Sequence, residues 1–131
     1  MNYTFTIFGK LPSLNEFLAA ERRTMRGRGG YSPGNQLKRR CEFLIRNAVN
    51  TQVRRVRIKK PIRIHYHYYE ENRKRDLDNI SAVAHKYVQD ALVRAGVIEN
   101  DGWRQIIGFT DHFEVDRNRP RIEVTLEEVE K

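Results

Sequence analysis

Two aspartates follow a run of cations in the segment from Arg73 to Asn79. If this segment is extended, Asp76 and Asp78 point to the same side and Leu77 turns back toward the core. Two carboxylates this close repel each other unless a positive charge lies between them, and their hard oxygen atoms suit magnesium or manganese. The pattern therefore predicts a divalent-metal site. The cations beside it, which suit contact with a phosphate backbone, are Arg73, Lys74 and Arg75.

The same aspartates have a simpler interpretation as helix-capping residues. Asp78 or Asn79 would make a favourable N-cap, and acidic residues in a first helical turn are stabilised by the helix dipole. Asp101 has a comparable alternative, because an Asn-Asp-Gly sequence commonly forms a tight turn without any catalytic role. The local motifs alone leave both interpretations open.

Composition narrows the class of protein. A chain of 131 residues with 39% hydrophobic residues is long and apolar enough to bury a core, and we expect one domain over residues 1–131. The 25 Lys and Arg outnumber the 17 Asp and Glu, which gives a net charge of +8. A basic domain of this size is suited to binding a polyanion, and nucleic acid is the commonest one.

The single cysteine and the N-terminal sequence bear on the cellular compartment. Cys41 has no second cysteine to pair with, so we expect a buried free thiol and no thiolate metal cluster. The first eight residues lack the basic start and apolar stretch of a signal peptide. No stretch approaches the ~18 apolar residues that a membrane span needs. We expect a soluble cytoplasmic protein that does not enter a membrane.

Alternation of apolar and polar residues predicts strands over Asn2–Phe8, from Pro61 to about Tyr69, over Gln105–Asp116 and over Arg121–Glu127. The last two strands, joined by a short turn, are expected to pair as a C-terminal hairpin. Apolar residues at three- and four-residue spacing predict two main helices, over 35–53 and 80–95. We therefore predict a mixed α/β (α+β) fold in which these helices pack on a mixed sheet.

A glycine-rich basic segment over residues 21–36 precedes the first main helix, after a short turn or helix that begins at Leu14. Its glycines predict a mobile loop, and clustered arginines such as Arg26 and Arg28 suit contact with phosphate. The alternative is a plain solvated connection.

On the Pro61 strand, His65 and His67 project to the same face, which makes a zinc site one interpretation. No third nitrogen ligand has a defined spacing, so we expect these histidines to cover the sheet or contact DNA.

Arg75-Asp76-Leu77-Asp78-Asn79, followed by a helix that ends at Gly96 and then by Asp101, resembles the RusA family of Holliday junction resolvases. The resemblance extends over essentially the whole chain, since Pro12-Ser13-Leu14-Asn15 is similar to that family's opening motif. It implies a RusA-like fold and a homodimer. It also implies magnesium, with manganese as a possible substitute, bound by Asp76, Asp78 and Asp101.

The resemblance further implies a helical lysine that assists cleavage. Counting forward from Asp78 places it at Ala82, whereas counting backward from Asp90 places it at Lys86, which we favour. On the helix, Lys86 shares a stripe with Asp90, so its alternative role is a surface ion pair. The residues that we assign to DNA contact are Asn15, Arg26, Arg28, Arg73, Lys74 and Arg75.

The implied activity is resolution of four-way DNA junctions by paired symmetric nicks through metal-activated water. Apolar residues of the C-terminal half are the candidates for the dimer surface. Two alternatives stay open: a nuclease of the same fold that cuts flaps or forks, and a non-catalytic nucleic-acid-binding module in which the aspartates only cap and turn.

Overall fold

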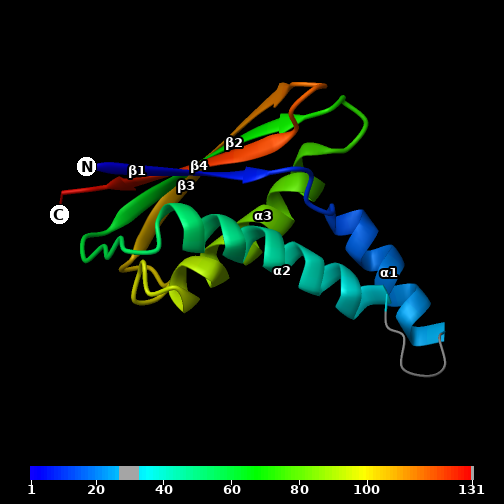
Figure 1. Cartoon of the computed structure of the whole chain (residues 1–131), viewed down its shortest axis with the longest axis horizontal. Helices are drawn as coiled ribbons and strands as arrows, with labels where there is room; N and C mark the ends of the chain where they lie inside the picture. The colour runs from blue at the N-terminus through cyan, green and yellow to red at the C-terminus, as the bar shows by residue number, and fades with distance from the viewer. Residues whose placement is uncertain (27–32, 131) are drawn as a thin grey trace.

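The computed structural model describes residues 1–26 and 33–130, and it has the mixed α+β architecture that the sequence predicts. Helices α2 and α3 lie across one face of a mixed sheet, and α1 extends to one side of it (Figure 1). In chain order the elements are β1 (Asn2–Phe8), α1 (Leu14–Arg26), α2 (Pro33–Gln52), β2 (Ile62–Glu70), α3 (Leu77–Arg94), β3 (Ile106–Val115) and β4 (Arg121–Glu128).

The strand order is β1-β4-β2-β3, so the predicted C-terminal hairpin is wrong. Strand β4 runs antiparallel to both β1 and β2, while β3 pairs parallel with β2 at the edge of the sheet. Every second residue of β2, from Ile62 to Tyr68, is buried, whereas most of β3 is exposed. Of these two strands, the more buried β2 takes an inner position and β3 an edge position. The turn before Arg121 carries the chain past the end of β2 instead of closing a hairpin.

The structure also corrects the region after β1, because α1 continues to Arg26 where the sequence predicted a basic loop from Glu21. Ser13 starts this helix: its hydroxyl oxygen accepts from the Glu16 amide at 3.2 Å and donates to the Glu16 carboxylate at 3.3 Å. This reciprocal arrangement satisfies a helix-terminal donor. Burial of Ala20 against the rest of the molecule then favours helix over loop. Arg28 lies outside the described residues.

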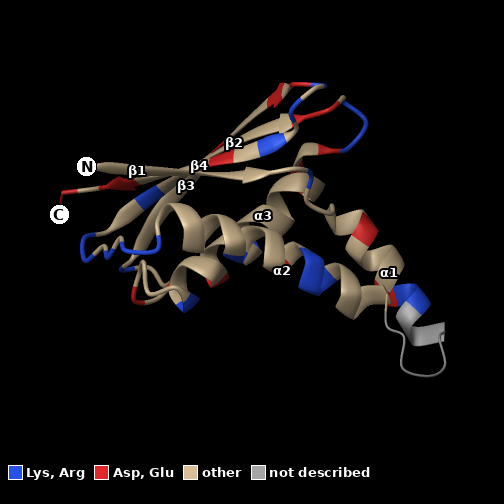
Figure 2. Ribbon diagram, viewed as in Figure 1, with Lys and Arg blue, Asp and Glu red and all other residues tan. Residues whose placement is uncertain are grey.

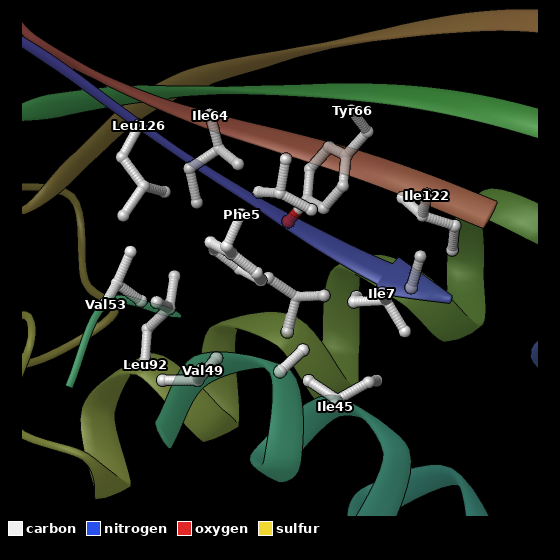
Figure 3. Packing of buried hydrophobic residues seen from close by; sticks show 14 of the residues in the cluster. Phe5, Ile7, Ile45, Val49, Val53, Ile64, Tyr66, Leu92, Ile122 and Leu126 are labelled. Carbon is white, nitrogen blue, oxygen red and sulfur yellow. The ribbon is translucent and has the colours of Figure 1, made fainter. Parts of the chain in front are cut away.

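The hydrophobic core lies between the sheet and helices α2 and α3 (Figure 3). Strands β1 and β4 contribute Phe5, Ile7 and Leu126, while α2 and α3 contribute Ile45 and Leu92; each of these is at most 1% exposed. Burial on this scale is the main source of the free energy that holds the helices on the sheet.

Cys41 lies in this core on α2 and is fully buried, which confirms the predicted buried thiol. Burial, with a smaller contribution from the charge of Glu42, raises the pKa of the Cys41 thiol to about 12. The thiol is therefore protonated and unreactive at neutral pH. Among the described helices, none has the length and apolar character required to cross a membrane.

Candidate functional site

Asp76 and Asp78 lie at the N-terminal end of α3. Asp76 is the N-cap, with an extended backbone (φ −71°, ψ 144°), and Leu77 is already the first helical residue. The predicted extended geometry therefore ends at Asp76, and Asp78 belongs to the first helical turn. Leu77 is 56% exposed instead of turned into the core, because the helix begins at this residue and directs its side chain outward. Both aspartates are exposed beside the positive end of the helix dipole.

Helix capping does not explain the role of the Asp76 carboxylate, because this side chain makes no capping hydrogen bond. Within residues 1–26 and 33–130, neither the Asp76 nor the Asp78 carboxylate has a side-chain hydrogen bond or an ion pair. The cations immediately before them do not neutralise them directly. Two adjacent carboxylates thus leave their oxygen atoms available to an external cation, and such hard oxygen donors fit magnesium or manganese.

A groove with a volume of about 410 Å³ opens beside Asp76, between the start of α3 and the end of β3. Its apolar lining comes from both elements, and its polar lining comes mostly from the loop between β2 and α3. The apolar residues are Leu77, Ile80, Phe113 and Val115, and the polar ones are Glu70, Asn72, Arg73, Arg75, Asp76 and Glu114. The candidate metal ligand Asp76 therefore borders a concave surface that combines charge with exposed apolar area.

Arg75 links three segments around this groove. Its Nε and Nη2 atoms donate to the two carboxylate oxygens of Glu70, each at 2.9 Å, and Nη1 donates to the carbonyl of Leu11 at 2.7 Å and to Glu16 at 3.1 Å. The side chain is only 13% exposed. Burial opposes its charge, but the hydrogen bonds and charges of Glu70 and Glu16 raise the pKa of Arg75 overall. Arg75 thus fixes the start of α3 against β2 and α1.

Removing this side chain should destabilise the protein. Arg75→Ala leaves Glu70, which is only 12% exposed, without its bidentate partner, and we expect the free energy of unfolding to fall by about 3 kcal/mol. Urea denaturation monitored by circular dichroism measures this change. Arg73→Ala is the matched control: Arg73 is exposed on the same loop, so the loss should stay below about 0.5 kcal/mol. Equal losses in both variants would contradict the positioning role of Arg75.

Arg73 and Lys74 remain exposed on the loop between β2 and α3. Figure 2 shows this basic loop next to the start of α3. The backbone amide of Lys74 donates to the Asn72 side-chain oxygen at 3.0 Å, which gives the loop a defined turn. These two cations can meet a polyanion that approaches the aspartates, whereas Arg75 is occupied by its protein partners.

Asp101 follows the C-terminal end of α3, whereas Asp76 immediately precedes its N-terminal end. Figure 1 shows the segments before and after α3 at opposite ends of the helix. Helix α3 has 18 residues, which corresponds to a length of about 27 Å. One chain therefore does not bring Asp101 together with Asp76 and Asp78. Asp101 is exposed, and Trp103, two residues further along the same turn, is 96% exposed.

Of the other assigned residues, Lys86, Asn15 and Arg26 lie on helices. Lys86 is exposed on α3, about 12 Å along the helix axis from Asp78. Its Nζ atom lies 5.9 Å from the centre of the Tyr87 ring, and the described residues contain no ion pair between Lys86 and Asp90. Asn15 is exposed in the first turn of α1, and Arg26 is the last residue of that helix.

No sequence pattern predicted the polar network that the structure places between α3 and the edge of the sheet. Asp111 on β3 accepts from the Tyr68 hydroxyl at 2.6 Å and lies 2.7 Å from Nε2 of His85. Burial, followed by the bond to Asp111, raises the pKa of Tyr68. The signal that would have identified this network is strand pairing, because β2 and β3 are neighbours only in the folded sheet.

The family model for the endodeoxyribonuclease RusA matches residues 18–127. This match includes α2, β2, α3 and β3 entirely and nearly all of β4, and it contains the three aspartates, but it begins after the segment Pro12–Asn15. A comparison with curated proteins found no match.

Proposed function

Because the chain belongs to the RusA endodeoxyribonuclease family, we propose that it resolves four-way DNA junctions by magnesium-dependent hydrolysis of the phosphodiester backbone. The observation that carries this proposal is the pair of exposed carboxylates at the start of α3, which have no protein partner among the described residues. A structural role would engage these carboxylates with backbone amides or cations. Carboxylates without a protein partner are available to bind a metal ion.

Each of the candidate site residues has its own role in the proposed reaction. Asp76 and Asp78 would hold magnesium or manganese, and the bound ion supplies a water of lowered pKa together with positive charge for the phosphate. Arg73 and Lys74 bind the backbone phosphates next to the site. Arg75 keeps the start of α3 in place through Glu70, and Lys86 is available to stabilise charge that develops on the phosphate. The net charge of +8 offsets the repulsion between DNA and the acidic site.

The third carboxylate of each site, that of Asp101, has to come from a second subunit. The length of α3 separates Asp101 from Asp76 within one chain, so we assign Asp101 at each site to the other protomer of a homodimer. In a two-fold interface each contact occurs twice, so a single interface completes two sites. Two sites related by a two-fold axis match the paired symmetric nicks that junction resolution requires.

The surfaces near these residues support this assembly. Trp103 follows Asp101 closely and is almost fully exposed, and an indole of this kind is typical of an interface anchor. The groove beside Asp76 offers apolar lining from Leu77 and Phe113. Insertion of Trp103 from one protomer into the groove of the other would cover both surfaces and carry Asp101 toward the two remaining carboxylates.

The experiment that tests this function compares cleavage of several labelled DNA substrates. With magnesium, the protein should nick a synthetic mobile four-way junction in symmetric pairs, should leave linear duplex intact, and should lose activity in a chelator. Cleavage of flaps or forks but not of junctions would instead indicate a nuclease of the same fold with another substrate. Junction binding without cleavage in magnesium or manganese would indicate a binding module.

A further inference from the structure

A second group of potential metal ligands lies on the face of the sheet opposite the helices. His67 on β2 pairs in register with His112 on the parallel neighbour β3, and Glu114 follows two residues later on the same side of β3. One ligand atom from each of the three side chains lies within 4.8 Å of the others. The sequence shows no third nitrogen ligand at a defined spacing, but strand pairing brings His112 beside His67.

The ring of His67 is already held in a fixed orientation. Its Nε2 atom is hydrogen-bonded to the Glu114 carboxylate, and the ring stacks on Tyr69 with centroids 4.4 Å apart and planes 3° from parallel. The guanidinium of Arg121 lies 3.7 Å from the centre of the Tyr69 ring. Because stacking on Tyr69 restricts the His67 ring, less conformational entropy is lost when it binds an ion.

We propose that His67, His112 and Glu114 bind a divalent transition metal, with zinc as the reference ion. Two imidazoles and one carboxylate are the ligand set of many zinc sites that keep a fourth position open, whereas magnesium prefers oxygen ligands alone. An ion held here joins β3 to β2. In the described sheet β3 is an edge strand next to β2, so the ion strengthens the attachment of an edge strand.

His65 provides an internal contrast on the same strand and the same face. Its Nδ1 lies 2.7 Å from the Thr110 hydroxyl and its Nε2 lies 2.9 Å from the Glu127 carboxylate, so both ring nitrogens are engaged. Because both of its ring nitrogens are engaged by these partners, His65 is not among the proposed ligands. His65→Ala therefore removes an imidazole from this face without removing one from the proposed site.

The experiment uses the full chain carrying Asp76→Asn and Asp78→Asn, so that the acidic site does not contribute to the titration. Calorimetry with zinc should show one equivalent bound per chain. In this background we expect His112→Ala to weaken zinc binding at least about tenfold, and His65→Ala to leave it unchanged. Glu114→Gln, which keeps the shape of the side chain, should also weaken binding. Unchanged affinity in His112→Ala and Glu114→Gln, or an equal loss in His65→Ala, would overturn the proposal.

Thermal unfolding gives a second readout that does not depend on nuclease activity. A ligand that binds only the folded state raises its stability in proportion to the logarithm of ligand concentration. Zinc should therefore raise the Tm of the parent and of His65→Ala but not of His112→Ala, and magnesium should not replace zinc. Equal Tm shifts in all three proteins would place zinc elsewhere and overturn the site.

Discussion

Asp76→Asn is expected to lower the rate of junction nicking in magnesium at least about a hundredfold, while junction binding is retained. The substitution removes one ligand charge from the pair at the start of α3 but keeps the size of the side chain. Asn is as good an N-cap as Asp, and the Asp76 side chain makes no capping hydrogen bond. The loss would therefore reflect metal binding, not a weaker helix. Cleavage of an end-labelled junction and gel-shift titration measure the two effects.

Asp90→Asn is the matched control for this experiment. It removes the same charge from the same helix, but Asp90 lies more than three turns beyond the carboxylate pair. We expect it to nick junctions at the wild-type rate. If Asp76→Asn also nicked at the wild-type rate, the carboxylate would not be a metal ligand. If wild type and variant both bound junctions and neither cut them, the aspartates would be structural.

The strand and helix positions were predictable because hydrophobic periodicity is a local property of the chain. Strand β1 has the predicted bounds, and β2, α2 and α3 differ by only a few residues at their ends. Pairing between strands is not local, so the hairpin prediction failed. The residues from Asp116 to Pro120 resemble a hairpin turn, but the burial of alternate residues in β2 makes that strand the central partner of both β3 and β4.

For the site residues, too, local features were predictable from the sequence, whereas contacts between distant segments were not. The sequence identified the carboxylate pair by residue type and spacing, and it identified Arg75 as one of three similar cations. Only the fold distinguishes Arg75, because its partners Leu11 and Glu16 are about sixty residues away in the chain. His112 became a potential ligand for the same reason, through its alignment with His67 on a neighbouring strand.

If Asp101 at each site comes from the second subunit, a mixed dimer should be active even where both parent homodimers are inactive. Homodimers of Asp76→Asn and of Asp101→Asn should both be inactive, because each lacks one carboxylate at both sites. A heterodimer of the two variants, isolated with a different affinity tag on each chain, combines both substitutions at one site and leaves the other site intact. We expect this heterodimer to recover about half of the wild-type nicking, measured on a junction labelled in all four strands.

The products of the heterodimer distinguish the possible arrangements. One intact site should give nicks in one strand of a junction at a time and not the symmetric pairs of the wild type. If each site took all its carboxylates from one chain, every site in the heterodimer would lack a ligand, and the mixture would be as inactive as its parents. That result would contradict the shared site while leaving the nuclease function itself intact, because wild-type cleavage is measured independently. The length of α3, which separates Asp76 from Asp101 within a chain, leads us to expect recovery.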